Sequence, residues 1–104
     1  MMNEQGHAPV HPGKVLLAKF LEPKGISQYR LAKEIGVTPR RVNEIVRGRR
    51  TITADTALRL GRFFEIEPQF WLSLQAHYDM ARAEDVLQGR LEQEIRTISM
   101  LVGQ

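Results

Sequence analysis

The stretch from Ser27 to Thr53 constrains the fold more than any other part of this 104-residue sequence. Two short amphipathic segments meet there at Gly36, which can adopt the left-handed conformation with which helices often end. Ser27 and Thr38 stand where helix N-caps are expected, because a hydroxyl accepts a hydrogen bond from an amide without a helical partner. Pro39 at the first helical position costs nothing for the same reason. The stretch therefore predicts two helices joined by a tight turn, from Ser27 to about Ile35 and from Thr38 to about Val46.

The second of these helices has two chemically distinct sides, given a rotation of about 100° per residue. Val42, Ile45 and Val46 form the side expected to face the core. The opposite side is mostly arginine and asparagine, which can form paired hydrogen bonds with guanine and adenine edges in a major groove. Solvated faces more often mix signs or favour lysine and glutamate, so this side indicates a DNA-reading helix. Its members are Arg40, Asn43, Glu44 and Arg47, with Arg41 at the edge.

The charges are unevenly distributed, although the formal net charge is only +3. Residues 27–62 contain nine lysines and arginines against three acids, whereas residues 63–104 contain three against seven. A basic middle beside an acidic end fits a nucleic-acid surface next to a region that faces another partner, such as a basic protein. Arg49 and Arg50 follow the second helix directly, where the chain would pass a phosphate backbone.

Several other functions find no support in the sequence. There is no cysteine, which excludes disulfides and thiolate metal sites. No apolar run approaches the roughly 20 residues that span a bilayer, and the first residues lack the apolar centre of a signal peptide, so a cytoplasmic protein is expected. The histidines are too scattered for a metal site, and Ser27 and Ser73 have no recognisable catalytic partners. We therefore predict no enzyme, no metal and no cofactor.

The remaining segments complete an all-α prediction. Residues 1–10 are polar and aperiodic, which predicts a flexible arm. Helices are expected from about Pro12 to Leu21, from Ala54 to about Phe64 after a Thr53 cap, and from Pro68 to about Ala83. Ala57, Leu60, Gly61 and Phe64 form the core side of the second of these, broadened by Leu58, and Phe70, Trp71, Leu74 and Tyr78 form that of the third.

Residues 83–104 form a separate segment in this prediction. Leu87, Leu91, Ile95, Ile98 and Leu101 recur at spacings of three and four, which predicts an amphipathic C-terminal helix. No further element follows to cover its apolar side. Its partner could be the core formed by residues 11–82, a second copy of the chain, or another protein.

Three stretches of the sequence carry a family resemblance. They are HPGKVLLAKFLEP, SQYRLAKEIGVTPRRVNEIVRGRRTITADTALRLGRFF and PQFWLSLQAHYD, in this order. The region from His11 to about Tyr78 thereby resembles the HigA-type antitoxins, also known as virulence-associated protein I, of the phage-repressor-like (XRE) helix-turn-helix family. The resemblance implies a five-helix lambda-repressor-like domain with an additional C-terminal helix.

The resemblance also implies a function. Such a protein would be a homodimer that binds double-stranded operator DNA, represses its own operon and neutralises a HigB-type toxin, a small basic mRNA endonuclease. The alternative is a free-standing XRE-type repressor without a cognate toxin. Both alternatives stay open on the sequence alone.

The resemblance assigns roles to single residues as well. Gln28 matches the family's phosphate-anchoring position, and Thr38, Pro39, Arg40 and Glu44 match positions that face bases or the adjoining phosphates. Pro39 has no side-chain donor, which moves base reading to Arg40, Arg41 and Asn43. Glu44 could accept from cytosine or orient Arg40 four residues earlier. Further phosphate contacts are expected from Arg47, Arg49 and Arg50.

Overall fold

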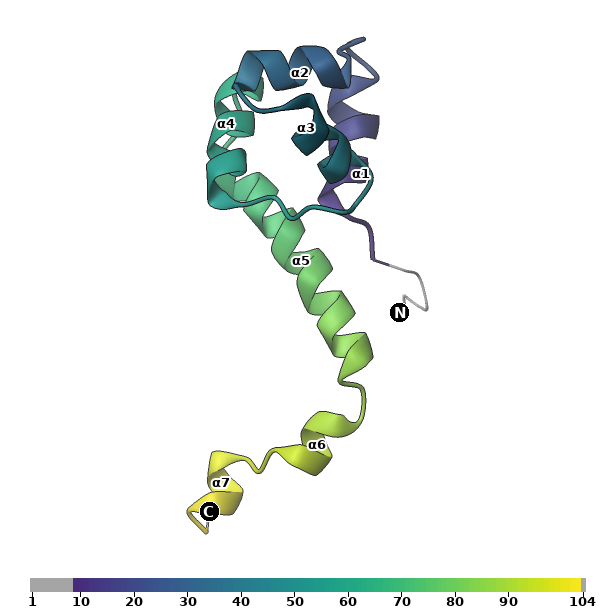
Figure 1. The fold of residues 1–104 in the computed structure, drawn as a ribbon. Helices are drawn as coiled ribbons and strands as arrows, with labels where there is room; N and C mark the ends of the chain where they lie inside the picture. The colour runs from purple at the N-terminus through teal and green to yellow at the C-terminus, as the bar shows by residue number, and fades with distance from the viewer. Residues whose placement is uncertain (1–8, 104) are drawn as a thin grey trace.

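The structure is a computed structural model that describes residues 9–103, and every regular element in this range is a helix (Figure 1). The all-α prediction is therefore confirmed. The predicted arm lies outside the described residues, apart from Pro9 and Val10. The elements are α1 (Pro12–Val15), η1 (Leu16–Leu21), α2 (Gln28–Ile35), α3 (Pro39–Val46), α4 (Ala54–Phe64), α5 (Pro68–Val86), α6 (Arg90–Glu94) and α7 (Ile98–Leu101).

The first predicted helix has the expected bounds but a wider second half. α1 continues into η1, a π-helix, in which hydrogen bonds join residues five apart. Its C-cap follows the same pattern, because the Glu22 amide donates to the Leu17 carbonyl at 2.9 Å. Leu16 and Leu21, which are also five residues apart, are both 1% exposed. The wider turn thus keeps both leucines on the buried side.

α1 crosses α3 at a backbone contact. A Cβ added to Gly13 would stand 1.8 Å from the Ile45 carbonyl oxygen, which leaves no space for any side chain. Gly13 is therefore required for this approach. Since Ile45 is on the buried side of α3, the contact fixes where α3 lies on the body of the protein.

The core is formed by residues of α2 to α5 packed under η1. Leu31, Ala32, Leu60 and Trp71 are at most 1% exposed. The ring of Phe20 lies 4.9 Å from that of Trp71 and 5.0 Å from that of Phe64, between centroids, and closes the core at one end. The prediction was wrong for two core residues. Leu58 is 61% exposed, because the buried side of α4 is narrower than predicted. Phe70 is 38% exposed and lies at the edge of the aromatic cluster.

The C-terminal part stands away from this core (Figure 1). α5 continues to Val86, beyond its predicted end, and the segment predicted as one amphipathic helix contains α6 and α7 instead. Gly89 has a left-handed φ of 76°, and Ile95 is extended, so the helix is interrupted twice. All described side chains from Gln88 onward are exposed. The radius of gyration is accordingly 17.8 Å, against about 13 Å for a compact chain of this size.

Candidate nucleic-acid interface

α3 is held in place by the local features predicted for it. Gly36 ends α2 in the left-handed region, with φ 74° and ψ 34°. The Thr38 hydroxyl accepts from the Arg41 amide at 3.0 Å and caps α3. Val42 and Ile45 are 1% and 2% exposed, so the apolar side is buried as predicted. The opposite side of α3 is thereby turned outward.

The residues predicted to read bases lie on or beside this outward side. Thr38, Pro39, Arg40 and Asn43 are exposed, and the side chain of Arg40 retains 86% of its accessible surface. Arg41 and Glu44 are partly covered. Within the two turns from the α3 cap to Glu44, the outward side thus carries several donors and one carboxylate acceptor, the kinds of group that recognise base edges in a major groove.

Glu44 is engaged by two arginines. Its Oε2 accepts from Arg40 Nε at 3.0 Å and its Oε1 accepts from Arg50 Nε at 2.9 Å. The hydrogen bonds from Arg50 and then Arg40 lower the pKa of the Glu44 carboxyl below its usual value. Both carboxylate oxygens of Glu44 therefore accept from arginines, and one of these is Arg40, four residues earlier. The link to Arg50 was not predicted.

Gln28 lies within reach of α3 as well as at the start of α2. Its side-chain oxygen accepts from Asn43 Nδ2 at 3.1 Å. The residue expected to contact a phosphate is thus joined to one expected to contact a base. Neither sequence position indicates this pairing, because it depends on how closely the two helices approach.

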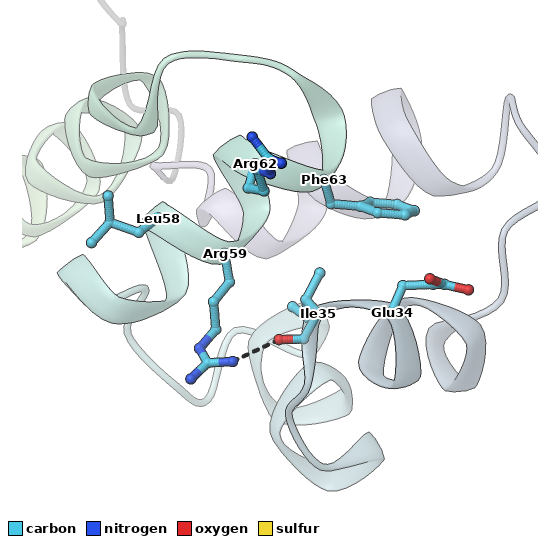
Figure 2. A pocket seen from close by; sticks show the side chains of 6 residues that line it. All are labelled: Glu34, Ile35, Leu58, Arg59, Arg62 and Phe63. Carbon is cyan, nitrogen blue, oxygen red and sulfur yellow. Dashed lines mark hydrogen bonds between the residues drawn. The ribbon is translucent and has the colours of Figure 1, made fainter.

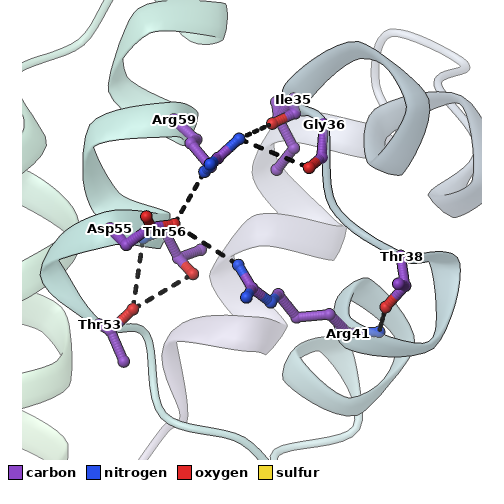
Figure 3. A network of polar contacts seen from close by, with 8 residues as sticks. All are labelled: Ile35, Gly36, Thr38, Arg41, Thr53, Asp55, Thr56 and Arg59. Carbon is purple, nitrogen blue, oxygen red and sulfur yellow. Dashed lines mark hydrogen bonds and ion pairs between the residues drawn. The ribbon is translucent and has the colours of Figure 1, made fainter.

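Arg41 is directed toward α4 rather than straight outward (Figure 3). Its Nη1 lies 3.5 Å from Asp55 Oδ1, which also accepts from Arg59 Nε at 2.8 Å. Arg59 and then Arg41 lower the pKa of Asp55. Arg59 further donates to the Ile35 carbonyl at 2.8 Å, at the C-terminus of α2 where a cation is favoured. The Asp55–Arg59 pair therefore also connects α4 to the turn before α3.

The segment that follows α3 is held in place by a side chain of α5. Arg47, Arg49 and Arg50 are exposed, as expected for phosphate contacts. Two residues after Arg50 the chain is anchored, because the buried backbone amide of Ile52 donates to Gln75 Oε1 at 2.8 Å. Gln75 is 5% exposed and its Nε2 donates to Asp79 Oδ1 at 3.0 Å. This buried amide was missed, although a glutamine on the apolar side of a predicted helix was a signal for it.

A family model described as Helix-turn-helix matches residues 17–71, which contain α2, the turn and α3. The chain belongs to the helix-turn-helix family.

The chain is similar to particular members of this family. The helix-turn-helix protein is 52% identical to virulence-associated protein I of Dichelobacter nodosus over 75 residues, 72% of this chain and 69% of that one. It superimposes on the Pseudomonas aeruginosa antitoxin HigA, solved with the higBA promoter, with a TM-score of 0.83 and 42% identity over 86% and 98% of the two chains. A further structure from Pseudomonas aeruginosa, solved with 18 base pairs of operator DNA, gives a TM-score of 0.83 and 42% identity over 89% and 100% of the two chains.

A hollow lies between α2 and α4, away from the outward side of α3 (Figure 2). It measures about 490 Å³ and is lined by Ile35, Leu58 and Phe63 with charged side chains at its rim. One of these, Arg59, is already bound to Asp55 and to the Ile35 carbonyl.

Two further properties of the helix-turn-helix protein concern only residues 9–103. No three histidine or acidic side chains in this range gather as a metal site would need. No helix there combines the length and the apolar character that a membrane crossing demands.

Proposed function

We propose that this protein binds operator DNA in a sequence-specific manner, with α3 in the major groove. The observation that carries the proposal is the outward side of α3, where Arg40 and Asn43 are exposed while Val42 and Ile45 anchor the helix. In this proposal Thr38, Arg40, Arg41 and Asn43 contact bases or adjoining phosphates. Pro39 only shapes the contact, and Glu44 orients Arg40.

The phosphate contacts come from both ends of the helix-turn-helix. Gln28 at the start of α2 and Arg47, Arg49 and Arg50 after α3 would position the protein on the backbone. The contacts of the three arginines would release counterions, so they make the affinity depend on salt without depending on sequence.

A single α3 offers too few base contacts for specific binding, so we propose a homodimer. Two-fold symmetry would place the two copies of α3 about 34 Å apart, one turn of DNA, on a palindromic operator. With three or four phosphates bound by each protomer, the slope of log K on log salt should be about −5 to −7.

We further propose that the protein is an antitoxin, which represses its own operon and neutralises a HigB-type toxin by direct binding. The similarity to an antitoxin HigA supports this function. Physical support comes from the C-terminal part, which is acidic and carries exposed apolar side chains such as Ile95 and Ile98. A small basic toxin would complement it in charge.

DNA binding is tested by fluorescence anisotropy with a labelled duplex from upstream of the protein's own reading frame. We expect tighter binding to this duplex than to a scrambled duplex of the same composition, with the salt slope given above between about 50 and 200 mM salt. Equal affinity for both duplexes would overturn sequence-specific binding. No affinity for either at low salt would overturn DNA binding altogether.

Toxin neutralisation is tested by co-expression with the product of any short basic reading frame directly beside this one. We expect the two proteins to co-purify and growth arrest by the neighbour to be relieved. If no such neighbour binds, while the operator is still bound, the protein is a free-standing repressor.

A further inference from the structure

A cavity lined by several arginines lies beside the segment that follows α3. It measures about 280 Å³ and lies between the segment from Gly48 to Thr51 and one side of α5. Arg49 and Arg82 both line it, although they are far apart in the sequence. Arg82 comes from α5, outside the region that the helix-turn-helix family model matches.

Arg82 is held in one orientation. Its Nη1 donates to the Tyr78 hydroxyl at 2.9 Å, and its guanidinium carbon lies 5.5 Å from the centre of the Tyr78 ring. The Tyr78 ring in turn meets the buried His11 ring edge-on, with centroids 4.8 Å apart. A guanidinium fixed in this way loses less conformational entropy when it binds an anion.

The charges of the cavity favour an anion. Arg49 and Arg82 remain exposed, and Arg50 also lines the cavity, although its Nε is paired with Glu44. The one acidic residue in the lining, Asp79, accepts a hydrogen bond from Gln75 Nε2 at 3.0 Å. The same Gln75 holds the Ile52 amide, so the two walls of the cavity are tied together at its base.

We propose that Arg82, together with Arg49, binds a backbone phosphate of the DNA in this cavity. This inference rests on the proposed DNA-binding function and extends it, because α5 would add a phosphate contact beyond the helix-turn-helix. The ligand is a phosphodiester group: a planar guanidinium donates two parallel hydrogen bonds to such a group. No base is read at this position, so the contact should strengthen binding to every sequence.

The test compares Arg82→Ala with Arg96→Ala, which removes the same charge from the exposed segment between α6 and α7. Both full-length variants and the wild-type protein are titrated against the upstream duplex and its scrambled counterpart at several salt concentrations. For Arg82→Ala we expect the salt slope to fall by about 0.9 per protomer bound, and the affinity to fall about eightfold per protomer at 0.1 M salt, equally for both duplexes. Arg96→Ala should match the wild type.

A third variant, Arg82→Lys, separates charge from packing. Lysine keeps the cation, so its salt slope should stay close to that of the wild type even if its affinity falls. An unchanged salt slope in Arg82→Ala, or equal losses of affinity in Arg82→Ala and Arg96→Ala, would overturn the inference about Arg82. The proposed DNA-binding function would stand in that case, because the wild-type protein still binds. Wild-type protein that binds neither duplex would overturn both.

Discussion

The side-chain amide of Asn43 donates to the side-chain oxygen of Gln28 at 3.1 Å, across the angle between α3 and α2. Through this bond, the residue proposed to read a base is oriented by the residue proposed to bind a phosphate. Asn43 donates to the side-chain oxygen of Gln28 only. The side-chain nitrogen of Gln28 therefore remains available to donate to a phosphate of the DNA backbone. In the proposed function, this bond would link the position of the protein on the DNA to base recognition.

This link predicts that the effects of Gln28→Ala and Asn43→Ala on DNA binding are not additive. Asn43→Ala should cost about 1–3 kcal/mol on the operator and relax the preference at one base position. Gln28→Ala should weaken binding to all sequences and also release Asn43. A double-mutant cycle measured by anisotropy should give a coupling of about 0.5–3 kcal/mol. Additive losses would mean that each side chain contacts DNA independently.

Glu44 provides a second prediction, since it holds Arg40 and Arg50 at 3.0 and 2.9 Å. Arg40→Ala should cost about 1–3 kcal/mol and relax one base position. If Glu44 orients Arg40, Glu44→Ala should relax the same base position while strengthening binding to the scrambled duplex, because a negative charge is removed from the interface. A competition experiment with single-base variants of the operator distinguishes the positions. Relaxation at a different position would indicate that Glu44 itself contacts a base.

These relationships show where prediction from sequence ends. The caps at Ser27, Thr38 and Thr53 were predictable because they depend on residues within three positions of each other, and each hydroxyl accepts the expected amide. The buried side of α3 was predictable because it depends only on helical periodicity. By contrast, the bonds of Gln28 to Asn43 and of Gln75 to Ile52 join residues 15 and 23 positions apart, so they depend on tertiary packing.

The prediction of one amphipathic helix after Ala83 was wrong for a related reason. Spacings of three and four predict a continuous helix, but a repeat says nothing about whether the chain has a partner to pack against. In the structure the helix is interrupted at Gly89 and again at Ile95, and the predicted stripe is exposed from Leu91 onward. The boundary between residues 11–82 and 83–104 stays a prediction that truncation can test.

The contact of α1 with α3 predicts a severe effect of Gly13→Ala. The new methyl would lie 1.8 Å from the Ile45 carbonyl oxygen, a backbone atom that cannot move without displacing α3. We expect a loss of about 3 kcal/mol or more in the free energy of unfolding, measured by urea denaturation. Gly25→Ala is the matched control, because nothing lies within 4 Å of its Cβ and only its positive φ of 65° is strained, at about 1–2 kcal/mol. Equal losses would contradict the close approach.

His11 predicts a loss of stability at acidic pH. Burial lowers its pKa below the usual 6.5, against the opposing effects of Asp79 and of a hydrogen bond with the Arg50 backbone. Its Nδ1 also accepts from the Gly13 amide at 2.9 Å, which a protonated ring cannot do. Because the unfolded chain binds the proton more tightly, this stabilisation is complete above about pH 6.5 and is lost as the pH falls through the lowered pKa.

The measurement is urea denaturation at several pH values between about 7.5 and 5. His11→Asn is the comparison, because asparagine can still cap α1 but does not titrate. The wild type should lose more stability on acidification than the variant does. Parallel curves for the two proteins would show that other groups cause the acid sensitivity.

The exposure of the C-terminal part predicts that the DNA-binding body folds without it. Every described side chain from Gln88 onward is exposed, so a chain that ends at Gln88 loses no core contact. Its free energy of unfolding should match that of the full chain to within about 0.5 kcal/mol at low protein concentration. The comparison is a chain ending at Tyr78, which loses Asp79 from the network around Gln75 and should be less stable.

If the removed part instead joins two protomers, the full chain alone will become more stable as its concentration rises. In that case the truncated chain will sediment as a monomer and its salt slope on DNA will be about half as steep.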